Sequence, residues 1–153
     1  MNQIADNPLI ALQDNLAALL AAHPYFNDAE QTPILTEKLA DLEAHIDAKI
    51  MQAGGFGVVI TTAKGDRLGS PDDTELTAAI LTEELTVTII HLPLLDTRQR
   101  RALDAVFAAI QAVDTQPSSQ PLQTWRVLGH FYIENSADGV VTHHIRVSTK
   151  CIF

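Results

Sequence analysis

The hydrophobic spacing changes period at Gly54-Gly55, and this change limits the folds that are open to the chain. Before these glycines, apolar residues recur at the three- and four-residue spacing of amphipathic helices. After them, short segments rich in β-branched residues alternate apolar and polar side chains, as half-buried strands do. The sequence therefore predicts an N-terminal helical pair over residues 8–52 and a sheet with one helix over residues 56–151. We expect residues 1–153 to form a single α+β domain.

The helical part contains two start signals, Asn7-Pro8 and Thr32-Pro33, each a capping residue followed by proline at the first helical position. The first predicts a helix over about residues 8–22, which His23-Pro24 ends because a residue before proline avoids helical dihedrals. The second predicts a longer helix from Pro33 to about Gln52. Its apolar stripe consists of Leu35, Leu39, Leu42, Ile46 and Ile50.

The sheet part contains four predicted strands, which the sequence arranges in two adjacent pairs. The first pair is Phe56–Thr62 and Ile80–Leu92, joined by a long polar loop over residues 63–76. The second pair is Trp125–Glu134 and Val140–Cys151, joined by a turn that ends at Gly139. The predicted order is α-α-β-β-α-β-β, and the predicted sheet is mainly antiparallel and four-stranded, with the helices packed on it.

One further helix is expected between the two strand pairs. Asp96, with Gln99 three residues later, forms a capping-box pattern that predicts the helix start. Its apolar residues are expected to share one side facing the sheet. These are Leu103, Val106, Phe107, Ile110 and Val113.

Composition and charge exclude several classes of protein. With 19 acidic and 10 basic residues the net charge is −9, which opposes binding to nucleic-acid phosphates. No apolar run is long enough for a membrane span, and no secretory signal pattern begins the chain, so we expect a cytoplasmic protein. The single cysteine, Cys151, is expected to act as a small hydrophobic residue.

The histidines are the first candidates for a metal site or for catalysis. An even register in the closing hairpin places His130 opposite His144 and Phe131 opposite His143. His130 and His144, with Glu134, could then ligate a metal, although zinc normally requires three or four protein ligands. The alternative is that these histidines lie on an exposed or interface surface. No motif for nucleophilic catalysis or phosphate binding accompanies them, so we expect neither enzymatic activity nor a cofactor.

The remaining candidates are surfaces for contact with other proteins. The loop over residues 63–76 could reach a neighbouring subunit, and it contains charged residues at six positions. Arg98 and Arg101 belong to the main basic cluster and could bind an acidic neighbour. Phe153 ends an apolar tail that would gain by burial. The complete predicted interface set is Asp66, Arg67, Asp72, Asp73, Arg98, Arg101, His130, His144 and Phe153.

The order of elements resembles the tail-terminator and tail-completion proteins of long-tailed bacteriophages. The resemblance extends over about residues 34–150 and depends on the strand Glu84–His91 followed by Leu92-Pro93, on the helix from Thr97, and on the strand His144–Ser148 of the closing hairpin. It implies a small mixed sheet flanked by helices. The helical pair over residues 8–52 is a departure from the family pattern.

The resemblance also implies a function. Proteins of this family are structural, and they form a ring, often of six subunits, that caps the tail tube and joins it to the head. This chain would then be a homo-oligomer that contacts tail-tube or neck proteins, first in the host cytoplasm and then in the virion. The alternatives from the residues themselves are a stand-alone interaction or regulatory module, and a small metal protein or enzyme that uses His130 and His144.

Overall fold

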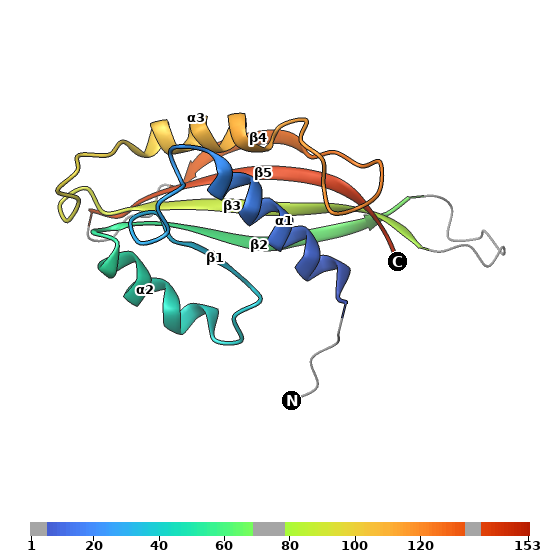
Figure 1. The fold of residues 1–153 in the computed structure, drawn as a ribbon, viewed down its shortest axis with the longest axis horizontal. Coiled ribbons are helices and arrows are strands. Elements are labelled where there is room, and N and C mark those ends of the chain that lie inside the picture. Colours follow the sequence, from blue (N-terminus) through green and yellow to red (C-terminus); the bar gives the residue numbers. More distant parts are fainter. Residues whose placement is uncertain (1–5, 69–78, 134–138) are drawn as a thin grey trace.

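The computed structural model describes residues 6–68, 79–133 and 139–153, and Figure 1 shows the arrangement of their helices and strands. Along the chain the elements are α1 (Pro8–Ala22), β1 (Ile34–Thr36), α2 (Leu42–Gln52), β2 (Phe56–Arg67), β3 (Ile80–His91), α3 (Ala102–Val113), β4 (Arg126–Ile133) and β5 (Val141–Ile152). The five strands form one sheet in the order β1-β2-β3-β5-β4. β1 is parallel to β2, and the other neighbours are antiparallel.

The sheet is therefore mixed and five-stranded. The prediction of a mainly antiparallel, four-stranded sheet was wrong because it did not include β1. Ile34–Thr36, expected in the second helix, pair with Val58–Ile60 as the parallel edge strand β1. The helix begins eight residues later, at Leu42. The burial of Leu35 explains why this segment is a strand. In β1 the Leu35 side chain is almost fully covered, and on a helix that faces solvent it would be more exposed.

α1 forms where the sequence predicts it. The Asn7 side chain accepts a hydrogen bond of 3.0 Å from the Leu9 amide, and Pro8 occupies the first turn. Leu12, Leu16 and Leu20 have no exposed surface and pack against the sheet. The helix ends at His23, whose amide bonds to the Leu20 carbonyl.

The central hairpin of β2 and β3 continues into the region expected to be a loop. Its register joins Phe56 to His91 at one end and Arg67 to Leu81 at the other, with a bulge between Thr62 and Lys64. Residues 63–67 are thus part of β2. The rest of the predicted loop, including Asp72 and Asp73, lies outside the described residues.

The core lies between the sheet and the helices α1 and α3. Because side chains alternate along strands, Phe56, Val58 and Ile60 face α1, while Gly57, Val59 and Thr61 face α2 on the opposite side. Trp125 joins the core beside α1, with its indole nitrogen donating to Asn15 at 2.7 Å. α1 and α3 therefore cover one face of the sheet, and α2 lies over the β2 side of the other.

The close contact of α2 with the sheet depends on glycine. A Cβ atom built at Gly57 would lie 2.7 Å from Cγ1 of Ile50, so any larger residue would push α2 outward. Ile50 is the one residue of α2 that is classed as buried. The helix is therefore held at its C-terminal end, and its N-terminal half is more open to solvent.

Candidate interaction surfaces

The junction between β3 and α3 contains a buried polar centre at Asp96. Oδ2 of Asp96 lies 2.9 Å from Nε2 of His91 and accepts a hydrogen bond of 2.9 Å from Nε of Arg100. Oδ1 accepts from the Arg98 amide at 3.0 Å. Burial by itself would raise the pKa of Asp96, but these hydrogen bonds hold that pKa at about 2. Asp96 is therefore an ionised carboxylate that fixes the shape of this loop.

Arg100 extends this centre into the surrounding chain. Its guanidinium donates to the carbonyl oxygens of Gln31 and Ala53 and lies 4.6 Å above the Phe56 ring. These contacts tie the loop to the segments before β1 and after α2. Arg100 is a structural residue, whereas its neighbours Arg98 and Arg101 are exposed.

The prediction that Asp96 and Gln99 form a capping box at the start of the helix was wrong. Asp96 accepts the amide of the residue two positions on, as a capping side chain does, but Gln99 adopts a φ of 56° and interrupts the helix. α3 begins at Ala102. Arg101 stands at its N-cap and pairs with Asp104 at 2.8 Å on the surface.

α3 presents a different face to the sheet from the one predicted. Its buried residues are mostly alanines: Ala102, Ala105, Val106, Ala108, Ala109 and Val113. Leu103 and Phe107 point outward, and each is 63% exposed. The prediction of both on the core side was wrong, because small residues let the helix approach the sheet more closely than large ones would. Neither residue was among the predicted interface residues.

In the closing hairpin the predicted histidine pairing was wrong. A bulge between Val127 and Gly129 shifts the register by one residue, so His144 pairs with Phe131 and His143 pairs with Tyr132. His130 pairs with Ile145. Cross-strand partners share a face and successive residues alternate, so His130 and His144 lie on opposite faces of the sheet. Together they cannot bind one metal ion.

The two neighbouring histidines of β5 have different surroundings. His144 stacks on Phe131, with ring centroids 5.3 Å apart and an interplanar angle of 11°. His143 is buried on the face that carries α3, and its Nδ1 atom has no hydrogen-bond partner among the described residues. Burial lowers the pKa of His143, and the nearby His130 lowers it further; burial also lowers the pKa of His144.

A second buried acid, Glu83, lies near the end of β2. Glu83 is 3% exposed and lies directly over Gly65, where there is no Cβ atom to obstruct it. Burial raises the pKa of Glu83, and the charge on Asp66 raises it further. Glu83 and Glu84 formed one acidic cluster in the sequence, but they face opposite sides of the strand, and Glu84 bonds to Arg146 at 2.8 Å. Exposed Asp66 and Arg67 lie at the end of β2.

The chain terminus closes against the start of β3. Phe153 donates its amide to the carbonyl of Ala79 at 2.8 Å, and its side chain remains 43% exposed. Cys151 is buried, in agreement with its predicted role as a small hydrophobic residue. Phe153 is therefore fixed by its backbone and still presents an aromatic ring to a partner.

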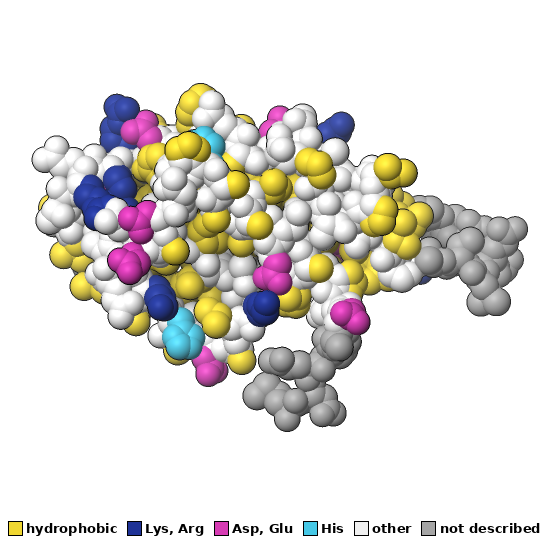
Figure 2. Space-filling view, viewed as in Figure 1, with side chains coloured by type: hydrophobic (Ala, Val, Ile, Leu, Met, Phe, Trp, Pro, Cys, Tyr) yellow, Lys and Arg dark blue, Asp and Glu magenta, His cyan; other side chains and the backbone are white. Residues whose placement is uncertain are grey.

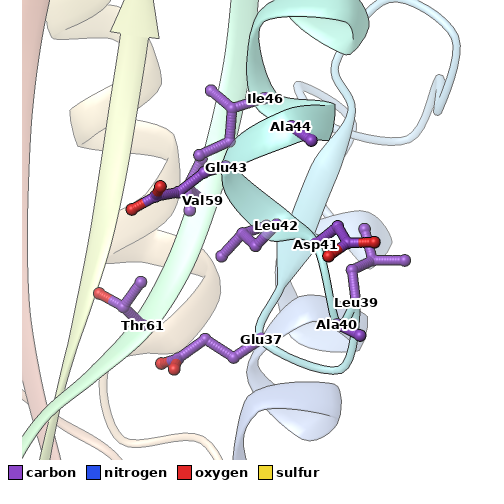
Figure 3. A pocket seen from close by; sticks show the side chains of 10 residues that line it. All are labelled: Glu37, Leu39, Ala40, Asp41, Leu42, Glu43, Ala44, Ile46, Val59 and Thr61. Carbon is purple, nitrogen blue, oxygen red and sulfur yellow. The ribbon is translucent and has the colours of Figure 1, made fainter.

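Two hollows lie beside α2. The first, of about 770 Å³, lies between α2, the loop before it and β2; in Figure 3, Leu42 and Ile46 extend toward Val59, whereas Asp41 points away from the strand. Its Glu37 carboxylate already accepts from the Thr62 amide at 2.7 Å and from Gln13 at 2.9 Å. The second, of about 520 Å³, lies between the C-terminal half of α2 and the sheet and is lined mostly by apolar side chains.

Within the described residues, no group of three or more His, Cys, Asp or Glu side chains is arranged to hold a metal ion. Nor does any helix of that part of the chain have the length and apolar character that a membrane span requires. The described surface combines exposed apolar side chains, charged side chains and open hollows. Chemically, such a surface is suited to binding other proteins.

These features define a class by fold: a mixed five-stranded α+β sheet with α1 and α3 on one face and α2 on the other. A solved structure with this fold is a chain of a virion of a native gene transfer agent particle. The TM-score is 0.52 and the identity 12%, and the match covers 94% of this chain and 96% of that chain. No protein-family model and no curated protein matches the sequence.

Proposed function

We propose that this chain is a structural subunit of a phage-type virion that acts in the tail or neck as a tail-terminator-like ring between tail tube and head. The observation that carries the proposal is the shared fold with a chain of a gene transfer agent virion, over almost the full length of both chains. A match over 94% of this chain includes most of residues 8–52. The N-terminal helical region is therefore compatible with a virion protein of this fold.

The surface supports an assembly role. Exposed large apolar side chains occur at both ends and on both faces, including Leu103 and Phe107 on α3 and Phe131 on β4. Figure 2 shows hydrophobic side chains reaching the surface across the face that carries α1 and α3. Apolar patches of this kind on a small protein mark contacts with other subunits. We expect a homo-oligomer that also binds tail-tube or neck proteins.

The net charge of the chain supports a position between the head and the tail of the particle. A ring between head and tail surrounds the path of the DNA, and a wall with net negative charge lets DNA pass without binding. The net charge of −9 fits this requirement. The proposal assigns no catalytic activity and no cofactor to the chain.

The test is deletion of the gene in the phage, prophage or gene transfer agent locus that encodes it. The expected result is filled heads and separate tails in electron micrographs, with joining restored by a plasmid copy. Mass spectrometry of purified complete particles should detect the chain in a few copies for each tail. Normal particles from the deletion strain, and absence of the chain from particles, would favour a stand-alone interaction module instead.

A further inference from the structure

α3 has an apolar ridge that its own fold leaves uncovered. Leu103 and Phe107 stand one turn apart on the side of the helix away from the sheet, and each is 63% exposed. The opposite side of α3 is buried through its alanines. A helix that is apolar on both sides is normally buried on both. The ridge is thus a surface that gains free energy when another surface covers it.

The opposite face of the sheet has an apolar hollow. Its apolar lining consists of Ile46, Ile50 and Met51 of α2, Ile90 of β3, and Leu92 and Val140 next to the ends of β3 and β5. Met51 is 58% exposed at its edge. Among the described residues, α2 is the helix on this face, and it lies over β1 and β2 rather than over β5 and β4. The hollow has the shape and chemistry to receive an apolar ridge, but it belongs to the other side of the molecule.

The charges beside these surfaces are complementary. Exposed Arg98 and Arg101 precede the ridge; Arg101 is paired with Asp104 of α3, so Arg98 is the cation of the two for which no ion pair is found among the described residues. Exposed Asp47 lines the hollow, and Glu43 lies one turn before it on α2. Two copies with a charge of −9 each repel one another in most orientations. An approach that brings the arginines to the acidic side of α2 reduces this repulsion and is therefore favoured.

We propose that the Leu103–Phe107 ridge of one copy docks into the hollow between α2 and the sheet of a second copy. The interface is head-to-tail, because ridge and hollow lie on opposite faces of the sheet. Every copy carries both surfaces, so the contact repeats from copy to copy and closes into a ring when the rotation permits. This inference rests on the proposed function, and it names the surfaces by which the subunits associate.

Two variants separate this interface from other arrangements. Leu103→Ser/Phe107→Ser removes the ridge, and Met51→Glu places a charge at the hollow; all three positions are exposed, so both variants should keep the circular dichroism spectrum of the unsubstituted protein. In analytical ultracentrifugation each variant alone should associate at least about tenfold more weakly. Mixed in equal amounts they should form a one-to-one dimer, because one intact ridge meets one intact hollow.

Other outcomes overturn the proposal. If α3 packed against α3 of a second copy, the ridge variant would be monomeric, Met51→Glu would associate normally with itself, and the mixture would contain no dimer made of one chain of each variant. A monomeric unsubstituted protein at every concentration would also overturn the interface. It would leave the proposed virion function standing, since that depends on the separate detection of the chain in particles.

A crosslinking experiment tests the same contact directly. Met51→Cys/Phe107→Cys places two thiols on opposite faces of one chain, where they cannot join within the molecule. Mild oxidation should give a ladder of disulfide-linked oligomers in gel electrophoresis, whereas each single variant should give at most a dimer. Met51→Cys/Leu122→Cys, with its second thiol at a fully exposed position in the loop between α3 and β4, is the matched control and should give no ladder. If the double variant gives no ladder, the proposed interface is wrong.

Discussion

His91 and Asp96 are joined in the interior, with Nε2 of the histidine 2.9 Å from Oδ2 of the aspartate and both side chains at most 4% exposed. The pair links the end of β3 to the loop that leads into α3, and Arg100 completes it. Its geometry sets the direction of α3 and so the position of the proposed ridge. This polar centre is structural, and its removal should affect stability first.

Asp96→Asn should lower the free energy of unfolding by about 2–4 kcal/mol, because it leaves the Arg100 guanidinium without its buried counter-ion. Urea unfolding at neutral pH measures the change. Asp104→Asn breaks the exposed pair with Arg101 and is the control, with an expected loss below about 1 kcal/mol. Equal losses in the two variants would contradict the role of Asp96.

The ionised Asp96 carboxylate should also make the free energy of unfolding depend on pH in the acid range. Its pKa is about 2 in the folded protein against an ordinary value of 3.8. A lowered carboxyl pKa contributes stability that is present above the unfolded value and is lost as pH falls through 3.8 toward the folded value. The difference in unfolding free energy between the protein and Asp96→Asn should therefore shrink between pH 4 and pH 2, about the range of the two pKa values.

His143 should destabilise the fold in mild acid. Burial lowers its pKa below the ordinary 6.5, so below that pH the unfolded chain binds a proton that the folded chain does not. The contribution of His143 to the free energy of unfolding is thus fully present above pH 6.5 and falls as pH decreases. His143→Leu should reduce the loss of stability between about pH 7.5 and pH 5.5, measured by urea unfolding. His45→Leu, at an exposed position on α2, is the control for the loss of a histidine elsewhere in the chain.

Glu83 should have the opposite dependence. Burial raises its pKa, so the stability linked to its neutral form is fully present below the ordinary value of 4.5 and is lost as pH rises through the folded value. Glu83→Gln keeps the shape without the charge, and it should unfold at higher urea concentration than the unsubstituted protein at pH 8. Glu84→Gln, which breaks the partly exposed pair with Arg146, should give no such gain. A destabilised Glu83→Gln at pH 8 would show that the charged form is favoured.

Gly57→Ala should loosen α2. The new Cβ would lie 2.7 Å from Ile50, and overpacking of this kind costs about 1–3 kcal/mol. Gly57→Ala/Ile50→Ala also removes Cγ1 of Ile50, the atom in that contact, so the double variant should lose less than the sum of the two single losses. Thermal unfolding and proteolysis of the α2 segment measure the effect. Unchanged stability in Gly57→Ala would mean that α2 is not seated on the sheet through Ile50.

The long elements with strong patterns were predictable from sequence. The cap and leucine spacing of α1, the alternation of β3, and the two segments of the closing hairpin each depend on neighbours within the same segment. The prediction that the N-terminal part is entirely helical was wrong because β1 is three residues long. A strand of that length is set by its partner Val58–Ile60 and leaves almost no pattern of its own.

The exposure of the candidate interface residues was predictable in part, and their role in an interface stays a prediction. Asp66, Arg67, Arg98 and Arg101 are exposed, as an interface role requires, and Phe153 is partly so. The pairing of His130 with His144 failed because a bulge of one residue moves a side chain to the other face. The ridge of Leu103 and Phe107 was missed because helical spacing alone does not distinguish the face that packs on the sheet when large residues point outward and alanines inward.

The sequence by itself determined the class of fold, the positions of the strong helices and strands, and the acidic balance, because local spacing and charge are properties of the chain as written. Only the tertiary structure decided which residues share a face. A parallel edge strand, a bulge and a close alanine contact depend on partners far away in the sequence. Those contacts leave Leu103 and Phe107, which the sequence placed in the core, on the surface.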